Sequence, residues 1–270
     1  METTKTILIT GAGSGFGEGA AIGLAQLGHT VIAGVQIYPQ VTALREKVKA
    51  LGLEKNLRVE KLDILDQYDV KNALTWDIDI FFSNAGIGEA GPVFEMPMDL
   101  VEKNFQTNVF APLAISQKFI SKWIKGGKKG KIVYTSSMGG LFTPAGFGIY
   151  VSTKHALEAI AEALQQEVKP YNIQIQTINP GAYLTGFNET MADAPFRWMD
   201  DEVNFTKKAD LRATFDSLLG TPEGTLDASE MINAMIEIVP KEEGKFRNVV
   251  PQFVEDMLKE HQLNAWENRI

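Results

Sequence analysis

The sequence predicts an α/β fold built on a doubly wound parallel sheet of about seven strands, with helices on both faces. Short apolar strands alternate with longer amphipathic stretches along the 270 residues, and this alternation is typical of successive βαβ units. The strands are almost continuously Ile, Val, Leu and Phe, which indicates a sheet covered on both sides. A glycine-rich turn follows the first strand and opens a helix, as in Rossmann-like folds.

The individual elements follow from the same patterns. Strands are predicted where apolar runs are short, at 6–10, 30–35, 57–62, 78–82, 131–135, 173–178 and 246–250. Helices are predicted where apolar residues recur at helical spacing, at 20–28, 40–51, 100–123, 150–168 and 227–239, with a polar helix over 253–270. The helix over 20–28 ends on a glycine and that over 150–168 ends before a proline.

The chain is expected to form a single domain over 1–270, because no linker divides it. Residues 182–222, called here the lid segment, contain few β-branched residues and several large apolar ones. The segment follows a strand at the edge where open α/β sheets bind ligands. We interpret it as a mobile substrate lid of one or two short helices, the alternative being a helical pair packed on the body.

The composition excludes several classes of partner. The formal net charge of −8 disfavours nucleic acid as a partner, and the lysine run 125–131 is interpreted as a solvated turn. The sequence has no cysteine and only three, widely separated histidines, so no metal site is expected. Neither a signal peptide nor an apolar run of membrane-spanning length is visible. We therefore expect a cytoplasmic protein without a membrane partner.

The glycine-rich turn predicts a dinucleotide site. Glycines 11, 13, 15 and 17 lie between the first strand and the first helix. Glycine permits a tight turn and a close approach of the backbone to a pyrophosphate. The helix N-terminus adds unpaired N–H groups and the positive end of its dipole. A glycine turn alone is weak evidence, but this one has the preceding strand and the following helix that the motif requires.

A second motif could move a proton. Tyr150 and Lys154 are one helical turn apart and share a face of their helix, while Ser137 lies thirteen residues earlier. A Tyr-x-x-x-Lys pair by itself is common on helix surfaces. Its combination with the glycine turn, in this order, indicates an enzyme that passes a hydride to or from a nicotinamide cofactor.

With these motifs, the chain resembles the short-chain dehydrogenase/reductase family in its compact single-domain form. The resemblance covers about residues 5–185 and rests on motifs in the expected order. They are Thr10-Gly11-x-x-x-Gly15-x-Gly17, Asn84-Ala85-Gly86, Asn108, Ser137 with Tyr150 and Lys154, and Asn179-Pro180-Gly181 followed by Thr185. Two departures are the serine at position 83 and the absence of an Asp-Gly-Gly near the last strand.

The resemblance implies a role for each catalytic candidate. Tyr150 would be the general acid/base that protonates a ketone or deprotonates an alcohol, and Ser137 would hydrogen-bond the same oxygen. Lys154 would hold the nicotinamide ribose, and Asn108 would anchor a water that leads the proton to solvent. We expect the lysine ammonium and an oxidised nicotinamide to favour the Tyr150 phenolate. Alternatively, Asn108 merely satisfies a helix kink.

The predicted cofactor is NAD, with NADP as the alternative. Gln36 occupies the end of the second strand, where an acidic residue would bind the ribose hydroxyls and an arginine a phosphate. Asp63 matches the family's adenine-contacting aspartate, although a turn residue would read the same way. The cofactor-binding candidates are Gly11, Ser14, Gly15, Phe16, Gly17, Gln36, Asp63, Ile64, Asn84, Ala85, Gly86, Tyr150, Lys154, Pro180, Gly181 and Thr185.

The substrate candidates are mostly large and apolar. They are Met138, Phe147, Ala182, Tyr183, Met191, Phe196 and Trp198. They favour a hydrophobic ketone or secondary alcohol, although each could instead belong to the core. The predicted function is thus an NAD(P)-dependent alcohol dehydrogenase or carbonyl reductase. A redox sensor that binds the cofactor without turnover is the alternative, and an epimerase or dehydratase ranks last.

The resemblance also implies a homo-oligomer, a tetramer or a dimer, because family members often associate through their fourth and fifth helices. The helix after Tyr150 carries a broad apolar stripe. Part of that stripe must pack on the sheet, so the stripe alone does not establish an interface.

Overall fold

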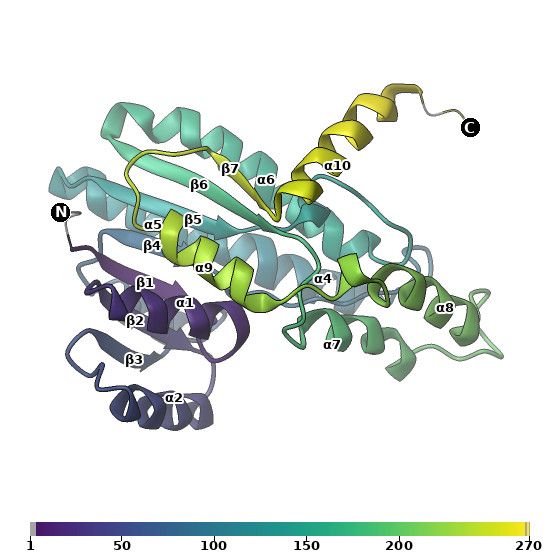
Figure 1. Ribbon diagram of the computed structural model, residues 1–270, viewed down its shortest axis with the longest axis horizontal. Helices are drawn as coiled ribbons and strands as arrows, with labels where there is room; N and C mark the ends of the chain where they lie inside the picture. Colours follow the sequence, from purple (N-terminus) through teal and green to yellow (C-terminus); the bar gives the residue numbers. More distant parts are fainter. Residues whose placement is uncertain (1–3, 268, 270) are drawn as a thin grey trace.

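A single sheet of seven parallel strands forms the centre of the molecule, with the strand order β3-β2-β1-β4-β5-β6-β7 (Figure 1). The computed structural model describes residues 4–267 and 269. The strands are β1 (Thr6–Thr10), β2 (Thr30–Val35), β3 (Leu57–Lys61), β4 (Ile80–Ser83), β5 (Gly130–Thr135), β6 (Ile173–Pro180) and β7 (Arg247–Val250). The prediction of a doubly wound sheet of about seven strands is confirmed.

Helices cover both faces of this sheet. One face packs against α1 (Gly15–Gln26), α2 (Tyr38–Ala50) and α9 (Ala228–Ile238). The other face packs against α3 (Gln67–Ala73), α5 (Ala111–Gly126) and α6 (Gly148–Val168). Successive residues of a strand point to opposite faces, so Ile7 and Ile9 enter the first core and Leu8 the second.

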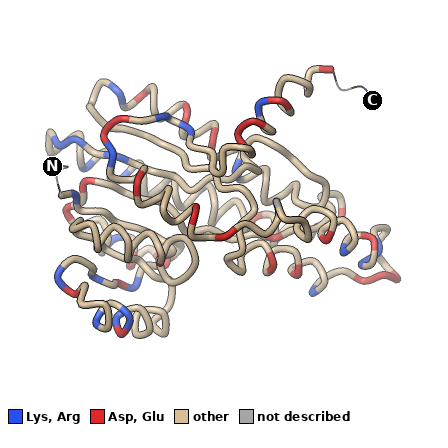
Figure 2. Tube along the Cα trace, in the orientation of Figure 1, with Lys and Arg blue, Asp and Glu red and all other residues tan. Residues whose placement is uncertain are grey.

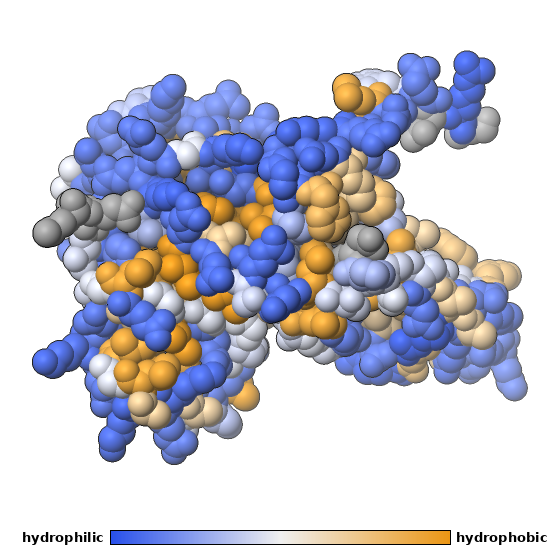
Figure 3. Space-filling view, viewed as in Figure 1, coloured by the Kyte–Doolittle hydropathy of each residue, from blue (hydrophilic) through white to orange (hydrophobic). Residues whose placement is uncertain are grey.

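Close contact between α1 and α9 depends on small residues. A Cβ on Gly19 or Gly23 would lie within 2.5 or 2.1 Å of side-chain atoms of Ile232 or Ile236. Figure 3 shows apolar residues gathered on this face where α1 and α9 lie side by side. Charged residues of both signs are scattered over the outer elements (Figure 2).

The order in which successive strands are added to the sheet reverses at β1. This strand pairs with β2 on one side and with β4 on the other, and ligands of open α/β sheets bind where the strand order reverses. Thr10 lies opposite Gly34 of β2, and Ile9 lies opposite Phe82 of β4. The carboxyl ends of these three strands therefore meet at one edge, directly beside the glycine turn.

Several helices differ from the sequence prediction. The first helix begins at Gly15 rather than at residue 20, because the last glycines of the turn already form its first turn. The short α3 was not predicted; the Asp66 carboxylate caps it by accepting bonds from the N–H groups of Tyr68 and Asp69. The helix expected over 100–123 is longer and broken: α4 (Met98–Phe105) and α5 enclose a π-helical turn, η1 (Gln106–Phe110).

Lys131 corrects the interpretation of the lysine run as a solvated turn. Its side chain is buried, and its ammonium donates hydrogen bonds to the carbonyls of Ile238, Val239 and Lys241 at the end of α9. The last carbonyls of a helix lack partners within the helix and attract a cation. Burial lowers the pKa of this ammonium to about 8.

The lid segment forms α7 (Phe187–Asp193), the turn η4 (Ala194–Arg197) and α8 (Lys208–Leu219), and the turn η5 (Pro222–Gly224) begins at its last residue. Its apolar side chains make a third, smaller core with Phe147, Tyr150 and Val151. Finally, α10 (Gln252–Asn264) and η6 (Ala265–Glu267) project from the body (Figure 1). Within the described residues, no helix combines the length and the apolar character needed to cross a membrane.

Candidate active site

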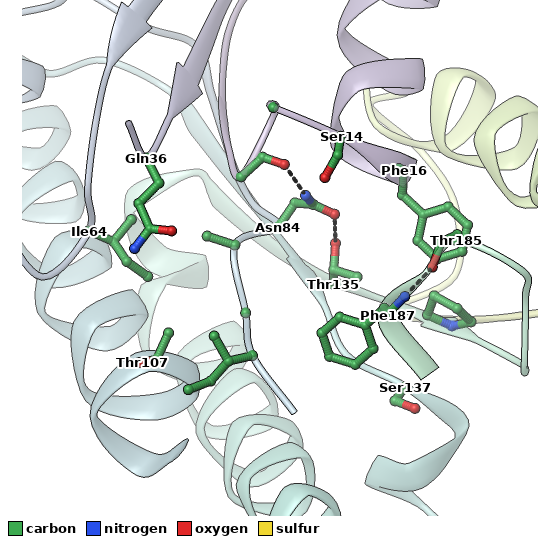
Figure 4. Close-up of a pocket in the computed structure, with 18 of the residues that line it drawn as sticks. Ser14, Phe16, Gln36, Ile64, Asn84, Thr107, Thr135, Ser137, Thr185 and Phe187 are labelled. Atoms are coloured by element: carbon green, nitrogen blue, oxygen red, sulfur yellow. Dashed lines mark hydrogen bonds between the residues drawn. The ribbon is translucent and has the colours of Figure 1, made fainter. Parts of the chain in front are cut away.

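A cavity of about 350 Å³ lies beside the carboxyl ends of β1 and β4. The glycine turn forms part of its wall. Gln36 and Ile64 lie toward one end of the cavity, and Ser137 and Phe187 lie toward the other (Figure 4). Of the residues expected at the cofactor, those lining the cavity are Gly11, Ser14, Gly15, Phe16, Gly17, Gln36, Asp63, Ile64, Asn84, Ala85, Gly86, Tyr150, Lys154, Pro180, Gly181 and Thr185.

The glycines of the turn allow backbone segments to approach more closely than a side chain would permit. A Cβ on Gly17 would lie 2.3 Å from the carbonyl oxygen of Gly11. Gly11 itself has a φ of 66°, and a Cβ there would lie 2.7 Å from the Cα of Ala85. Larger residues would therefore force the turn and the residues after β4 apart.

Asn84 joins the glycine turn to the neighbouring strands. Its side-chain amide donates to the carbonyl oxygens of Thr10 and Gly11, at 3.1 and 3.3 Å, and its side-chain oxygen accepts from the Thr135 hydroxyl at 3.1 Å (Figure 4). The Thr10 hydroxyl accepts in turn from the N–H groups of Asn84 and Ala85. This network fixes the wall of the cavity across β1, β4 and β5.

The turn fits the pyrophosphate of a dinucleotide. The cavity wall includes the N-terminal turn of α1, a twelve-residue helix. Its first N–H groups have no partner within the helix and carry the positive end of the dipole. Ser14, the residue before the helix, makes no side-chain capping bond to them. The glycine-shaped space and these donors together match what an anionic pyrophosphate requires.

The structure brings Ser137, Tyr150 and Lys154 together in the same cavity. Tyr150 and Lys154 lie on one face of α6, and the lysine nitrogen is 5.7 Å from the centre of the tyrosine ring. Ser137 lies two residues after the end of β5 and caps the 3-10 turn η2 (Met138–Gly140), whose Gly139 N–H donates to its hydroxyl at 3.0 Å. Lys154 donates to the carbonyl oxygen of Thr135 at 2.9 Å.

Burial dominates the ionisation of both catalytic candidates on α6. It raises the pKa of the Tyr150 phenol to about 12, against a smaller lowering by the Ser137 hydroxyl. It lowers the pKa of Lys154 to about 8, and the nearby carboxylate of Glu158 opposes that shift. The expected phenolate is therefore not favoured in the protein without bound cofactor. Removing the charged form from water costs more free energy than its interactions with neighbouring groups recover.

Asn108 lies behind the cavity wall rather than in it. The asparagine side chain donates to the carbonyl oxygen of Ile87 at 2.8 Å and to the Thr153 hydroxyl at 3.1 Å, and accepts from the Ile87 N–H at 2.9 Å. It sits in the middle of the π-helical turn, a distortion that often occurs at functional sites. In this structure its side chain holds the backbone that follows Asn84-Ala85-Gly86.

Asp63 and Gln36 meet at the opposite end of the cavity. The Gln36 amide donates to the Asp63 carboxylate at 3.4 Å, and the same carboxylate accepts from the Leu65 N–H at 3.0 Å. Asp63 is thus a turn residue that also lines the cavity. Among the described residues, the basic side chains lining the cavity are Lys103 and Lys154.

Of the seven substrate candidates, only Tyr183 lines the cavity, and its hydroxyl donates to Glu230 of α9 at 3.2 Å. Phe147 packs on Phe215 with ring centres 4.8 Å apart. Met191 and Trp198 pack over Gly88 and Gly91 in the loop after β4. The Arg212 guanidinium lies over the ring of Phe196. Met138 lies in η2, and the carbonyl oxygen of Ala182 accepts from the Leu226 N–H.

These placements have a physical cause. The large apolar side chains of the lid segment are removed from water only where they pack between the segment and the body, so most of them fill that space instead of lining the cavity. Phe187, which we did not predict, faces the cavity and packs on Tyr150 with ring centres 5.6 Å apart. Other unpredicted lining residues flank predicted site residues, and this adjacency was the available signal for Ile87, Thr107, Thr135 and Ser136. Gln40, Lys103 and Asn188 line the cavity without such a signal.

Gln40 illustrates what sequence spacing cannot show. Its side-chain oxygen accepts from the N–H groups of Gln36 and Ile37, while its amide lies over Gly13. The Gln40 side chain therefore links the residues after β2 to the glycine turn. Within the described part of the chain, no group of three or more His, Asp or Glu side chains is placed to hold a metal ion.

The fold and the glycine-lined crevice define an α/β protein of the dinucleotide-binding class. The chain belongs to the short-chain dehydrogenase/reductase family, since the family model described as short chain dehydrogenase matches residues 5–195. It is thus an oxidoreductase of a family that generally depends on NAD or NADP.

Three similar proteins illustrate the family's range. The uncharacterized oxidoreductase YusZ of Bacillus subtilis is 32% identical over 69% of this chain and 68% of its own length. The NADPH-dependent 3-dehydrocapnine reductase of Ornithobacterium rhinotracheale is 34% identical over 58% of this chain and 49% of its own. The structure of a short chain dehydrogenase/reductase from Burkholderia phymatum in complex with NAD has a TM-score of 0.81 and 22% identity, covering 100% of this chain and 96% of that one. This last likeness shows the shared fold.

Proposed function

We propose that this protein transfers a hydride between NAD and a hydrophobic ketone or secondary alcohol, with Tyr150 as the general acid/base. The observation that carries the proposal is the meeting of Tyr150, Ser137 and Lys154 in the cavity that the glycine turn lines. A cofactor sensor would not need a phenol, a hydroxyl and an amine at one end of its site.

The chain's own groups have separate tasks in this reaction. With its pKa raised to about 12, the Tyr150 phenol is protonated at neutral pH and can donate to a carbonyl oxygen. The Ser137 hydroxyl would bond the same oxygen and hold it in place. Lys154, fixed by the Thr135 carbonyl, would bind the ribose beside the nicotinamide. The bound nicotinamide supplies or accepts the hydride.

The charge at the Gln36 end of the cavity supports NAD. A 2′-phosphate there would meet the Asp63 carboxylate, which lies 3.4 Å from the Gln36 amide, and like charges repel. Ribose hydroxyls could instead hydrogen-bond to both side chains. The 3-dehydrocapnine reductase is NADPH-dependent by name, so the two cofactors should be compared directly.

The apolar lid segment supports a hydrophobic substrate. Phe187 presents aromatic surface to the cavity beside Tyr150, and Tyr183, which packs on Phe16, also lines the cavity. Apolar walls with a few polar groups are typical of small-molecule sites. In this proposal the lid segment closes over the substrate and excludes water.

The test is oxidation of NADH and of NADPH by a panel of apolar ketones, with Tyr150→Phe measured in parallel. Removing a general acid lowers kcat by about 10²- to 10⁴-fold, whereas NADH affinity should change little. Tyr171→Phe, at an exposed position outside the cavity, is the matched control. Tight NADH binding without turnover of any carbonyl would instead favour a sensor.

A further inference from the structure

A buried carboxylate lies one turn beyond Lys154 on the same face of α6. Glu158 is 4% exposed, and a carboxylate out of water is stable only when it is paired. One of its oxygens accepts from the Asn179 side-chain amide at 2.6 Å, and the other accepts from the Arg247 Nε at 2.9 Å. Three elements, α6, β6 and β7, therefore meet at this residue.

Asn179 connects that carboxylate to the catalytic serine. The same Asn179 amide group that donates to Glu158 also donates to the carbonyl oxygen of Ser137 at 3.1 Å. The Asn179 side-chain oxygen accepts from the Thr177 hydroxyl at 3.0 Å, so the side chain is held at both ends. Asn179 is fully buried and directly precedes Pro180 and Gly181, which line the cavity.

The serine loop also packs directly on Glu158. A Cβ on Gly140 would lie 2.8 Å from the Ser136 hydroxyl and 2.9 Å from the Glu158 Cγ. Within the described residues, the buried Ser136 hydroxyl has no hydrogen-bond partner. The loop is therefore held by close packing and by the Asn179 bond, in addition to the bond from the Gly139 N–H to the Ser137 hydroxyl.

We propose that Glu158 is a positioning residue, which holds the Ser137 loop through Asn179 and faces the Lys154 ammonium along α6. This inference rests on the proposed function, because it assigns Glu158 the support of two groups of that site. The carboxylate would act on the serine through geometry and on the lysine through charge.

Few other charges act on this face. The sequences of β6, η2 and η1 contain no ionisable side chain. Strand β5 contributes Lys131, bonded to the end of α9, and Tyr134, bonded to Ser116. Strand β7 contributes Arg247, and α6 itself contributes Tyr150, the exposed His155 and the exposed Glu162, which is 3.8 Å from Arg247. Helix α4 also packs on α6 and contributes Lys103, which lines the cavity and lies 3.8 Å from Glu89. A charge change at Glu158 should therefore be felt by Lys154.

The experiment compares Glu158→Gln with the control Glu162→Gln, which also removes a carboxylate near Arg247 but touches neither Asn179 nor the serine loop. The pKa of the Lys154 ammonium is measured by nitrogen NMR without cofactor, and NADH affinity is measured from pH 6 to 10. For Glu158→Gln we expect a lower pKa of Lys154. A pKa lower by one pH unit reduces the protonated fraction of Lys154 about tenfold above pH 8, so NADH binding there should weaken by about the same factor. We expect kcat to fall as well, because the Ser137 loop loses its anchor.

A merely structural Glu158 would lower the melting temperature and leave the pKa of Lys154 as in Glu162→Gln, which would overturn the inference. If Glu158→Gln does not fold, the paired variant Glu158→Gln with Arg247→Gln removes both charges together. A smaller shift in the same direction is then expected, because Glu158 is the charge that acts on Lys154 along α6. Failure of the proposed function is distinguishable, because it would appear in the parent protein as NADH binding without turnover of any carbonyl, or as activity that survives Tyr150→Phe.

Discussion

The part of the molecule around β1 and the glycine turn, called here the cofactor half, and the lid segment are held in different ways. In the cofactor half, β1 lies between two helix layers, and Ile7, Leu8 and Ile9 are completely buried. Its glycine turn is fixed by backbone contacts as short as those around Gly17. The lid segment has a small core of its own, and Val203 and Phe205 are 77% and 86% exposed.

Polar contacts from two carboxylates secure the outer part of the lid segment. The buried Glu89 pairs with Arg197 at 2.8 Å. Glu95 accepts from the N–H groups of Phe205 and Thr206 and from the Asn204 side chain, at 2.6, 3.1 and 3.2 Å. Few apolar contacts and exposed polar ones are typical of parts that open locally. The comparison teaches that cofactor binding should depend on backbone shape and substrate binding on replaceable side chains.

The sharpest test of the cofactor half is Gly17→Ala. The added methyl would meet the Gly11 carbonyl at 2.3 Å and the Asn84 amide at 2.6 Å, so the turn must move. Overpacking of this kind costs about 1–3 kcal/mol, and the upper end corresponds to about 100-fold weaker NADH binding. Fluorescence titration with NADH and thermal unfolding measure the two effects.

The control for this prediction is Gly126→Ala. Gly126 is also helical, but nothing lies within 4 Å of a Cβ there, and alanine favours the helix. This variant should bind NADH normally and unfold at the same or a higher temperature. Equal affinities of the two alanine variants would show that the turn adapts, and would remove the contrast between the two regions.

The second prediction concerns pH and the reaction direction. In the proposed reaction, ketone reduction uses the Tyr150 phenol, which stays protonated well below a pKa of about 12, so its rate at saturating NADH should be nearly constant from pH 6 to 8. Alcohol oxidation would use the phenolate, whose fraction grows about tenfold per pH unit below that pKa. The kcat/KM for an alcohol should therefore rise steeply from pH 7 to 9. A flat oxidation profile would show that Tyr150 is not the base.

The sequence predicted the cofactor half well because its signals are local. A glycine turn between a strand and a helix leaves few geometries for Gly11, Gly15 and Gly17, and the i, i+4 spacing places Tyr150 and Lys154 on one face. The parallel sheet and its two helix layers follow from strand–helix alternation, whereas the strand order is seen only in the structure. The seven residues of α3 escaped prediction because one short turn-capped helix carries little apolar periodicity.

The substrate side was not predictable in the same way. Met191, Phe196 and Trp198 have the composition of a pocket wall, yet they bury against the body. Only the packing of the lid segment decides which aromatic side chain faces Tyr150, and that residue is Phe187. Similarly, Lys131 looked solvated until α9, more than one hundred residues later, supplied its carbonyl partners.

The third prediction loosens the lid segment with Glu95→Gln. An amide group cannot accept all the bonds that the carboxylate accepts from residues 204–206. A lost charge-assisted bond is worth about 1.5 kcal/mol or more, so the KM for an apolar ketone should rise about tenfold while NADH affinity stays unchanged. Glu202→Gln, at an exposed position of the same segment, should behave like the parent protein. Equal losses of NADH and ketone binding would show that the two regions are not separable.

The smallest expected effect comes from Phe187→Leu. The ring of Phe187 lies 5.6 Å from that of Tyr150 and lines the cavity, whereas Phe205 in the same segment is 86% exposed. An aromatic pair is worth about 0.5–1.5 kcal/mol beyond its buried area. We therefore expect aromatic ketones to lose about threefold in kcat/KM relative to aliphatic ketones of equal size.

Phe205→Leu makes the same chemical change away from the cavity and should leave the ratio of the two ketone classes unchanged. The ratio matters more than either rate, because a general disturbance of the lid segment would slow both classes together. A change in selectivity at Phe187 alone would place substrate choice in a single side chain of the lid segment. An unchanged ratio would mean that the substrate contacts other residues, and that Phe187 serves only to cover Tyr150.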